Sequence, residues 1–126
     1  MKCITLLAGL ALLAVANFAL ALDIQPYSPE KLSAMQKSGA SVALHFHADW
    51  CPTCKAQDKV FNSWKGDASV HGTVLLVDYD KERVLKRQLG VRIQSTVIAY
   101  KGAKETGRLA GDTDPKALRA LLDSAN

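Results

Sequence analysis

Residues 41–55 read SVALHFHADWCPTCK, and this stretch decides the fold. Residues 41–48 alternate in the way that is typical of a β-strand. One face carries Val42, Leu44 and Phe46, and the other carries Ala43, His45 and His47. From 52 to 64 the apolar residues recur at the spacing of an amphipathic helix. The sequence therefore places Cys51 and Cys54 where a buried strand gives way to the start of a helix.

That position gives the three-residue spacing of Cys51 and Cys54 a chemical meaning. A thiol at a helix N-terminus faces unpaired N–H groups and the positive end of the helix dipole. We therefore expect the pKa of Cys51 to fall below the free value of about 8.5 and Cys51 to be the nucleophile. Cys54, one turn inside, is near enough to close a disulfide with Cys51 and is expected to be the resolving thiol. Pro52 at the first helical position costs no hydrogen bond and stiffens the loop.

Other uses of a Cys-x-x-Cys pair fit this sequence less well. Half of a zinc site would need a second pair, which residues 22–126 lack. Covalent haem attachment would need a histidine where the chain has Lys55. An inert structural disulfide would close too short a loop to gain much stability from chain entropy. The pair therefore favours thiol–disulfide exchange.

The remaining segments complete an α/β order around this motif. The sequence predicts helices over 28–38, 81–89 and 114–122. It predicts strands over 73–79, 97–100 and 106–110, with a hairpin turn at 101–104 between the last two. Helix, strand, helix, strand, helix, strand, strand, helix is the order of a small α/β domain with a mixed sheet.

The first segment has the pattern of an export signal. Lys2 precedes an apolar run over residues 4–22 that ends near the small-x-small triplet Ala19-Leu20-Ala21. We predict a signal peptide over residues 1–21, cleaved after Ala21, a folded domain over 22–126 and a periplasmic location. The alternative is an uncleaved anchor that holds the domain at the membrane facing the periplasm, since about 19 apolar residues can just span a bilayer.

Composition narrows the function classes. A chain of 126 residues with 48% hydrophobic residues is one domain at most and is neither disordered nor collagen-like. Of its three cysteines, Cys3 leaves with the predicted signal peptide, so the folded part keeps an even pair. The formal charge of +4 becomes +3 when Lys2 leaves. Basic residues gather at 81–87 without interleaved aromatics, so we expect a solvated face and no nucleic-acid partner.

The chain resembles the thioredoxin superfamily over residues 28–124. Two segments carry the resemblance: Ala48-Asp49-Trp50-Cys51 with Cys54-Lys55, and Leu89-Gly90-Val91-Arg92 with Thr96-Val97-Ile98-Ala99-Tyr100-Lys101. Within the superfamily, the Ala-Asp-Trp-Cys-x-x-Cys-Lys signature is similar to that of the soluble C-terminal domain of the periplasmic thiol:disulfide interchange protein DsbD. The resemblance implies a thioredoxin fold, with a central mixed sheet of four to five strands flanked by about four helices.

The resemblance also implies an activity and a substrate surface. It implies a monomeric oxidoreductase without a cofactor, acting on protein or small-molecule disulfides, with a membrane thiol reductant as a candidate electron donor. Electron flow depends on how strongly the fold stabilises the thiolate, and the resemblance to DsbD favours reduction. The residues expected to meet the substrate are Trp50, Pro52, Thr53, Ser95 and Thr96.

Three positions depart from the thioredoxin pattern. The family has a cis-proline before Thr96, where this chain has Ser95. A cis bond before a non-proline residue costs about 2.5–4 kcal/mol, so we expect a trans bond and a reshaped loop. The family's buried carboxylate and its lysine partner become His45 and Leu76. His45 is then the candidate proton relay to Cys54, because an imidazole with an ordinary pKa of about 6.5 exchanges protons near neutral pH.

Two further functions remain open on the sequence. Cys51, Cys54 and His45 offer thiolate and imidazole ligands that suit Cu(I) or Zn(II), which would make the domain a metal-binding thioredoxin-fold protein. Alternatively, the loop that contains Ser95, called the Ser95 loop below, no longer binds a substrate. The domain would then be a degenerate thioredoxin-fold binding module. His47, on the same strand face as His45, is a weaker candidate for acid–base or metal-ligand chemistry.

Overall fold

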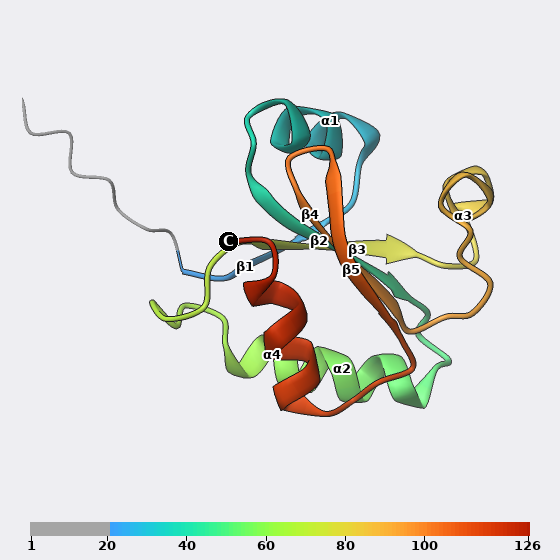
Figure 1. Ribbon diagram of the computed structural model, residues 1–126. Coiled ribbons are helices and arrows are strands. Elements are labelled where there is room, and N and C mark those ends of the chain that lie inside the picture. The colour runs from blue at the N-terminus through green and yellow to red at the C-terminus, as the bar shows by residue number, and fades with distance from the viewer. Residues whose placement is uncertain (1–20) are drawn as a thin grey trace, which may run out of the picture.

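The computed structural model describes residues 21–126, so residues 1–20 of the predicted signal peptide lie outside the described part. Four helices and five strands follow one another within it (Figure 1). In chain order they are β1 (Asp23–Pro26), α1 (Pro29–Lys37), β2 (Ser41–His47), α2 (Pro52–Ser63), β3 (Thr73–Asp78), α3 (Arg83–Leu89), β4 (Thr96–Lys101), β5 (Lys104–Ala110) and α4 (Pro115–Asp123). The predicted α/β fold is confirmed.

The five strands form one mixed sheet in the order β1-β3-β2-β4-β5. β3 pairs in parallel with β1 and β2, whereas β4 is antiparallel to both β2 and β5. β2 therefore lies at the centre of the sheet. In the register of β2 and β3, His45 lies opposite Leu76, so two of the departures from the thioredoxin pattern are cross-strand neighbours.

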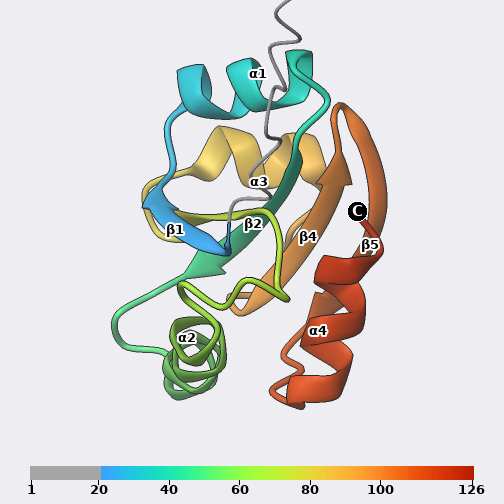
Figure 2. The ribbon, with the colours of Figure 1, turned by 90° about the vertical axis from the view of Figure 1, so that its left-hand side faces the viewer.

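The alternation along β2 divides the core into two layers. Val42, Leu44 and Phe46 pack on one face with side chains of α1 and α3. Ala43 lies on the other face, with residues of α2 and α4 such as Phe61 and Leu118. Figure 2 shows the same division, with α1 and α3 on one side of the sheet and α2 and α4 on the other. His45 belongs by its register to the α2 side, beneath the helix that begins at the cysteines.

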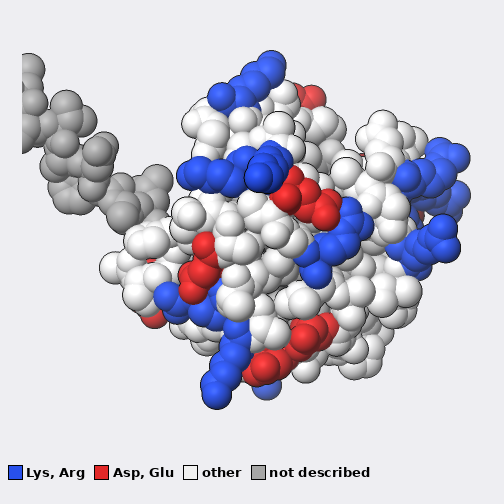
Figure 3. Space-filling model, in the orientation of Figure 1, with Lys and Arg blue, Asp and Glu red and all other residues white. Residues whose placement is uncertain are grey.

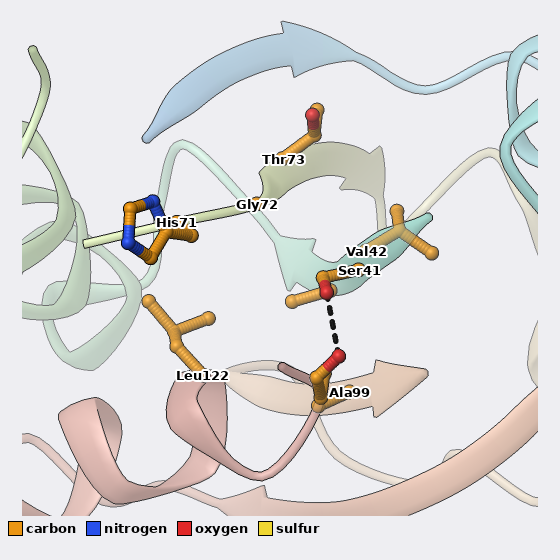
Figure 4. A pocket seen from close by; sticks show the side chains of 9 residues that line it. Ser41, Val42, His71, Gly72, Thr73, Ala99 and Leu122 are labelled. Carbon is orange, nitrogen blue, oxygen red and sulfur yellow. Dashed lines mark hydrogen bonds between the residues drawn. The ribbon is translucent and has the colours of Figure 1, made fainter. Parts of the chain in front are cut away.

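Local capping sets the helix starts that the sequence predicts. Ser28 caps α1 by accepting a hydrogen bond from the Lys31 N–H at 3.1 Å, and Pro29 is the first helical residue. Asp114 caps α4 in the same way. Ala125 lies beyond the last helix, and its carbonyl accepts a hydrogen bond of 2.5 Å from the Ser41 hydroxyl, drawn as the dashed line from Ser41 in Figure 4. This bond ties the C-terminal end of the domain to the beginning of β2.

The structure corrects several element boundaries. β1 was not predicted, because it has four residues, includes Pro26 and forms only by pairing with β3 at the sheet edge, where proline is tolerated. β5 begins at Lys104 rather than 106, so the hairpin turn shortens to Gly102 and Ala103. α3 begins at Arg83 rather than 81, because the Asp78 carboxylate accepts hydrogen bonds from the N–H groups of residues 80 and 81 in a turn.

The charge distribution agrees with the predicted basic face. Lys and Arg side chains gather over α3 in Figure 3, and Arg83, Lys86 and Arg87 lie on that helix. The ammonium group of Lys86 lies 3.6 Å from the centre of the Tyr79 ring, a cation–π contact. No helix within residues 21–126 is long and apolar enough to cross a membrane.

Candidate active site

Cys51 is the residue that caps the N-terminus of α2. Its backbone is extended, and its sulfur accepts a hydrogen bond from the Cys54 N–H at 3.1 Å. Pro52 follows as the first helical residue. The Cys51 sulfur therefore occupies the place that a serine or aspartate oxygen takes at most helix starts, where N–H groups and the helix dipole favour a negative charge.

Both cysteines are buried thiols. Cys51 is 1% exposed and Cys54 is fully buried, and neither is bonded to another sulfur in this structure. The Cys54 thiol points to the Phe46 carbonyl at 3.8 Å. Burial, with the hydrogen bond to Cys51 adding to it, raises the pKa of Cys54 to about 11. Cys54 therefore holds its proton at neutral pH, as expected of a thiol that reacts second.

Trp50 stands at the surface beside the two buried thiols. It is 58% exposed, and its indole N–H donates to the Asp80 carboxylate at 2.8 Å. Next to it lies a groove of about 310 Å³ whose polar walls come from His47 and from Asp49, Asp78 and Asp80. Of the other residues predicted to meet a substrate, Pro52 is exposed and Thr53 is half-buried. These three side chains are therefore accessible to solvent.

The Ser95 loop has the trans geometry expected from the sequence, in an unusual conformation. No peptide bond among residues 21–126 is cis, and Ser95 has a φ of 62°, the one positive φ outside glycine in that range. Its N–H donates to the Phe46 carbonyl at 2.8 Å, and its own carbonyl accepts from the Gly111 N–H at 3.1 Å. Ser95 and Cys54 thus meet at the same carbonyl, that of Phe46.

Ser95 and Thr96, which are predicted to contact a substrate, do not present their side chains at the surface. Both residues are almost fully buried. The hydroxyl of Ser95 donates to the Gln94 carbonyl, and that of Thr96 donates to the Ile93 carbonyl at 2.8 Å. Their side chains are therefore used to shape the loop, and the apolar side chain that the loop exposes is Ile93, at 46%.

His45 lies in the core beneath α2. It is fully buried, and its ring packs edge-on against Phe61, with 5.3 Å between the ring centres. Nε2 lies 2.8 Å from Oε1 of Gln57, while Nδ1 has no hydrogen-bond partner. Burial lowers the pKa of His45 to about 4, although the bond to Gln57 partly opposes that shift. His45 is therefore neutral at pH 7.

Two polar residues of α2, missed by the sequence reasoning, complete this cluster. Gln57 is fully buried, and its Nε2 donates to the carbonyls of Ser95 at 3.0 Å and Asp112 at 2.8 Å. Asp58 is half-buried, and its Oδ2 lies 2.6 Å from Nε2 of His47. Burial raises the pKa of Asp58, while the charge and hydrogen bond of His47 oppose the rise. The sequence signal that could have revealed Gln57 and Asp58 is their position: they are two consecutive polar residues about one turn after Cys54 in an amphipathic helix.

The metal-binding hypothesis finds no ready cluster in the described part of the chain. Within residues 21–126 no group of three or more His, Cys, Asp or Glu side chains is arranged to hold a metal ion. The nearest ring to His45 among the histidines is that of His47, at 5.6 Å between ring centres. The set of Cys51, Cys54 and His45 stays a hypothesis.

The fold and the capping cysteine define a class: an α/β domain with a redox-type Cys-x-x-Cys pair at the start of the helix after its central strand. The sequence model of the Thioredoxin family matches residues 29–124, and the chain belongs to that family. The superfamily resemblance and the thioredoxin fold are thereby confirmed.

Individual relatives agree with this assignment. Putative thioredoxin-4 of Dictyostelium discoideum is 30% identical over 75% of this chain and 88% of its own length. Thioredoxin-like protein 1 of Schizosaccharomyces pombe is 32% identical over 74% of this chain, which corresponds to only 33% of that longer protein. Among solved structures, Trxlp from Edwardsiella tarda has a TM-score of 0.72 and 35% identity, over 79% of this chain and 98% of its own.

The burial of His45 predicts a loss of stability in acid. The unfolded chain protonates this histidine near pH 6.5, whereas the folded chain does so only near pH 4. Between these values the unfolded state binds more protons, so the free energy of unfolding decreases as the pH falls from 6.5 to 4. A shift of this size corresponds to roughly 3 kcal/mol. The raised pKa of Asp58 acts in the opposite direction and offsets part of the loss.

Urea unfolding at pH 7, 5.5 and 4 measures this dependence. The variant His45→Asn removes the titrating ring, so its free energy of unfolding should change much less across the same range, even if it starts lower at pH 7. Equal slopes in the variant and in the wild-type protein would show that another group causes the acid sensitivity.

Proposed function

We propose that the domain is a periplasmic thiol–disulfide oxidoreductase that works as a reductase or electron carrier. The observation that carries this proposal is the capping geometry of Cys51, whose sulfur receives the Cys54 N–H above a buried Cys54 thiol. Membership of the thioredoxin family supports thiol–disulfide exchange in general. The periplasmic location rests on the predicted signal peptide over residues 1–21, and the reductive direction rests on the resemblance to the C-terminal domain of DsbD.

The reaction uses the two sulfurs in sequence. The Cys51 thiolate attacks a disulfide R–S–S–R′, forms a Cys51–S–S–R mixed disulfide and releases R′ as a thiolate. Cys54 then gives up its proton and attacks the Cys51 sulfur, which forms the Cys51–Cys54 disulfide and releases R. The substrate gains two electrons, and the protein loses two. A dithiol donor, for which we propose a membrane thiol reductant, returns the pair to the reduced form.

The backbone of Ser95 is not available for hydrogen bonds to a substrate. The N–H and carbonyl of Ser95 are already bonded within the protein, so they are not free to pair with a substrate strand. Because Cys51 is 1% exposed, the side chains around it have to shift when a disulfide approaches. We expect such a disulfide to meet Trp50, Pro52 and Thr53 first, and Ile93 is the exposed apolar side chain that the neighbouring loop offers.

The reduction potential of the Cys51–Cys54 pair tests the direction of electron flow. Equilibration of the protein with glutathione redox buffers, followed by thiol trapping and mass spectrometry, gives this potential. A reductase should have a value near that of thioredoxin, about −270 mV, whereas a value near −120 mV would indicate an oxidant. A wild-type protein that forms no Cys51–Cys54 disulfide in any buffer would overturn the oxidoreductase proposal and favour the binding-module alternative.

The location has its own test. Full-length protein expressed in a Gram-negative host should be released with the periplasmic fraction, and its intact mass should correspond to a chain that begins at Leu22. Recovery of the uncleaved chain in the membrane fraction would favour the anchored alternative instead.

A further inference from the structure

The side-chain amide of Gln57 fixes the position of a proton on His45. Nε2 of Gln57 lies within hydrogen-bond distance of the carbonyls of Ser95 and Asp112. A carbonyl oxygen can only accept, so the amide NH₂ group has to face these two carbonyls, and Oε1 has to face His45. Oε1 can also only accept, and it lies 2.8 Å from Nε2 of His45. The ring of neutral His45 therefore carries its hydrogen on Nε2 and a lone pair on Nδ1.

That lone pair faces a second proton acceptor. Nδ1 of His45 lies 3.5 Å from Oδ1 of Asp58, and it makes no hydrogen bond. Both atoms are acceptors when the imidazole is neutral and the carboxyl group is ionised, so they repel one another where the buried ring meets the half-buried carboxylate. A single proton taken up between them would bond to both atoms and remove that repulsion. Each group therefore makes the other a better proton acceptor than it would be in the same place without that neighbour.

This pair of acceptors shares a face of α2 with Cys54 and is linked to the surface through His47. Asp58 follows Cys54 by four residues on α2, a spacing that puts the two side chains on the same face, with Cβ atoms about 5–6 Å apart. The other carboxylate oxygen of Asp58 lies 2.6 Å from Nε2 of His47. His47 is partly exposed and lines the groove beside Trp50. A path of ionisable groups thus runs from the neighbourhood of Cys54 to the surface.

We propose that Asp58 and His45 together accept the proton of Cys54 when this thiol attacks the mixed disulfide, and that His47 passes the proton to the solvent in the groove. This inference rests on the proposed function, because it assigns the base for its second step. Gln57 is a positioning residue, since it acts only by holding His45 in the required tautomer.

The proposed step balances in atoms and charge. The Cys54 S–H bond breaks, and its proton moves to the pair formed by Asp58 and His45, directly or through one water molecule. The Cys54 sulfur bonds to the Cys51 sulfur while the bond between Cys51 and the substrate breaks, and the electron pair leaves with the substrate thiolate. Because Cys54 otherwise holds its proton at neutral pH, a built-in base gives this step its largest advantage there.

The groups that face Asp58 come from each element around it. His45 and His47 approach it from β2, and Asp49 in the loop before α2 adds a like charge at longer range. On α2 itself Cys54 and Gln57 are its inward-facing neighbours. Asp49 is fully exposed, lines the groove and lies 3.9 Å from His47, so it belongs to this path. Glu30, exposed in the first turn of α1 on the other side of the sheet (Figure 2), provides a control for the loss of one negative charge away from the path.

The aromatic disulfide 5,5′-dithiobis(2-nitrobenzoate) separates the two chemical steps. Attack by Cys51 releases one coloured thiolate, and attack by Cys54 on the resulting mixed disulfide releases the second. Stopped-flow absorbance from pH 7 to pH 9 measures the second release. We expect a nearly constant rate in the wild-type protein and in the control Glu30→Gln. In Asp58→Asn we expect a loss of at least tenfold at pH 7 and a rate that rises about tenfold per pH unit, as for a thiol deprotonated only by hydroxide.

Each outcome of this experiment is decisive. A second release in Asp58→Asn with the wild-type pH profile overturns the inference and leaves the proposed function intact. The absence of even a first release in the wild-type protein overturns the proposed function itself. Nitrogen-15 spectra of the histidine rings give a readout that does not depend on activity: the reduced wild-type protein should show His45 protonated on Nε2 and unprotonated on Nδ1. The opposite tautomer would overturn the inference.

Discussion

Replacing Cys51 with serine is expected to lower the rate of disulfide reduction by roughly 10³-fold or more. The serine hydroxyl stays protonated at neutral pH even at a helix N-terminus, so the attacking thiolate is lost. The capping hydrogen bond from the Cys54 N–H can pass to the hydroxyl oxygen, because serine is a good cap residue. The fold should therefore survive, and the loss of activity reports chemistry. Turbidity from insulin reduction by dithiothreitol measures the rate.

Cys54→Ser is the matched variant, and it is expected to lose only the second step of the reaction. Cys51 remains able to attack, so one equivalent of substrate thiol should be released and the mixed disulfide should persist on Cys51. Intact-mass spectrometry should find this adduct in Cys54→Ser and not in Cys51→Ser. An adduct carried by Cys54 in the Cys51→Ser variant would reverse the assigned roles. Turbidity that develops equally fast with Cys51→Ser and with the wild-type protein would instead support the binding-module alternative.

The part of the site that could be predicted from the sequence is the part fixed by local geometry. The spacing of Cys51 and Cys54 at a strand-to-helix junction depends only on neighbouring residues, and the structure shows Cys51 at the helix start where the sequence predicts it. The alternation along β2 likewise predicts His45 on the face away from Leu44 and Phe46, and the structure shows that α2 covers this face. In each case the pattern of a few consecutive residues determines which way a side chain points.

The hydrogen-bond network around His45 could not be predicted in the same way. Gln57 joins three segments that are distant in sequence: β2, the Ser95 loop and residue 112. Only the packing of α2 on the sheet brings these segments together. β1 was missed for the same reason, since its four residues become a strand through their pairing with β3. The positive φ of Ser95 is likewise imposed by bonds from both sides of the loop.

Restoring the family's proline at the Ser95 position is expected to destabilise this protein strongly. Proline fixes φ near −65°, whereas Ser95 has a φ of 62°. Proline also lacks the N–H that Ser95 donates to the buried Phe46 carbonyl at 2.8 Å. Together these effects should lower the free energy of unfolding by about 3 kcal/mol or more, and the midpoint of thermal unfolding by more than about 10 °C. Thermal unfolding followed by circular dichroism measures the change.

Ser95→Gly is the control that isolates the backbone. Glycine adopts a positive φ without strain and keeps both the N–H and the carbonyl, so this variant should lie within about 1 kcal/mol of the wild-type protein. If Ser95→Pro and Ser95→Gly were equally stable, the loop would not need the positive φ and the N–H donor of Ser95. The contrast follows from how this chain holds the loop: Phe46, Gly111 and Gln57 all bond to the Ser95 backbone, and that arrangement needs a donor and a left-handed residue where other thioredoxins place a proline. The residue that the family favours therefore does not suit the loop that this sequence builds.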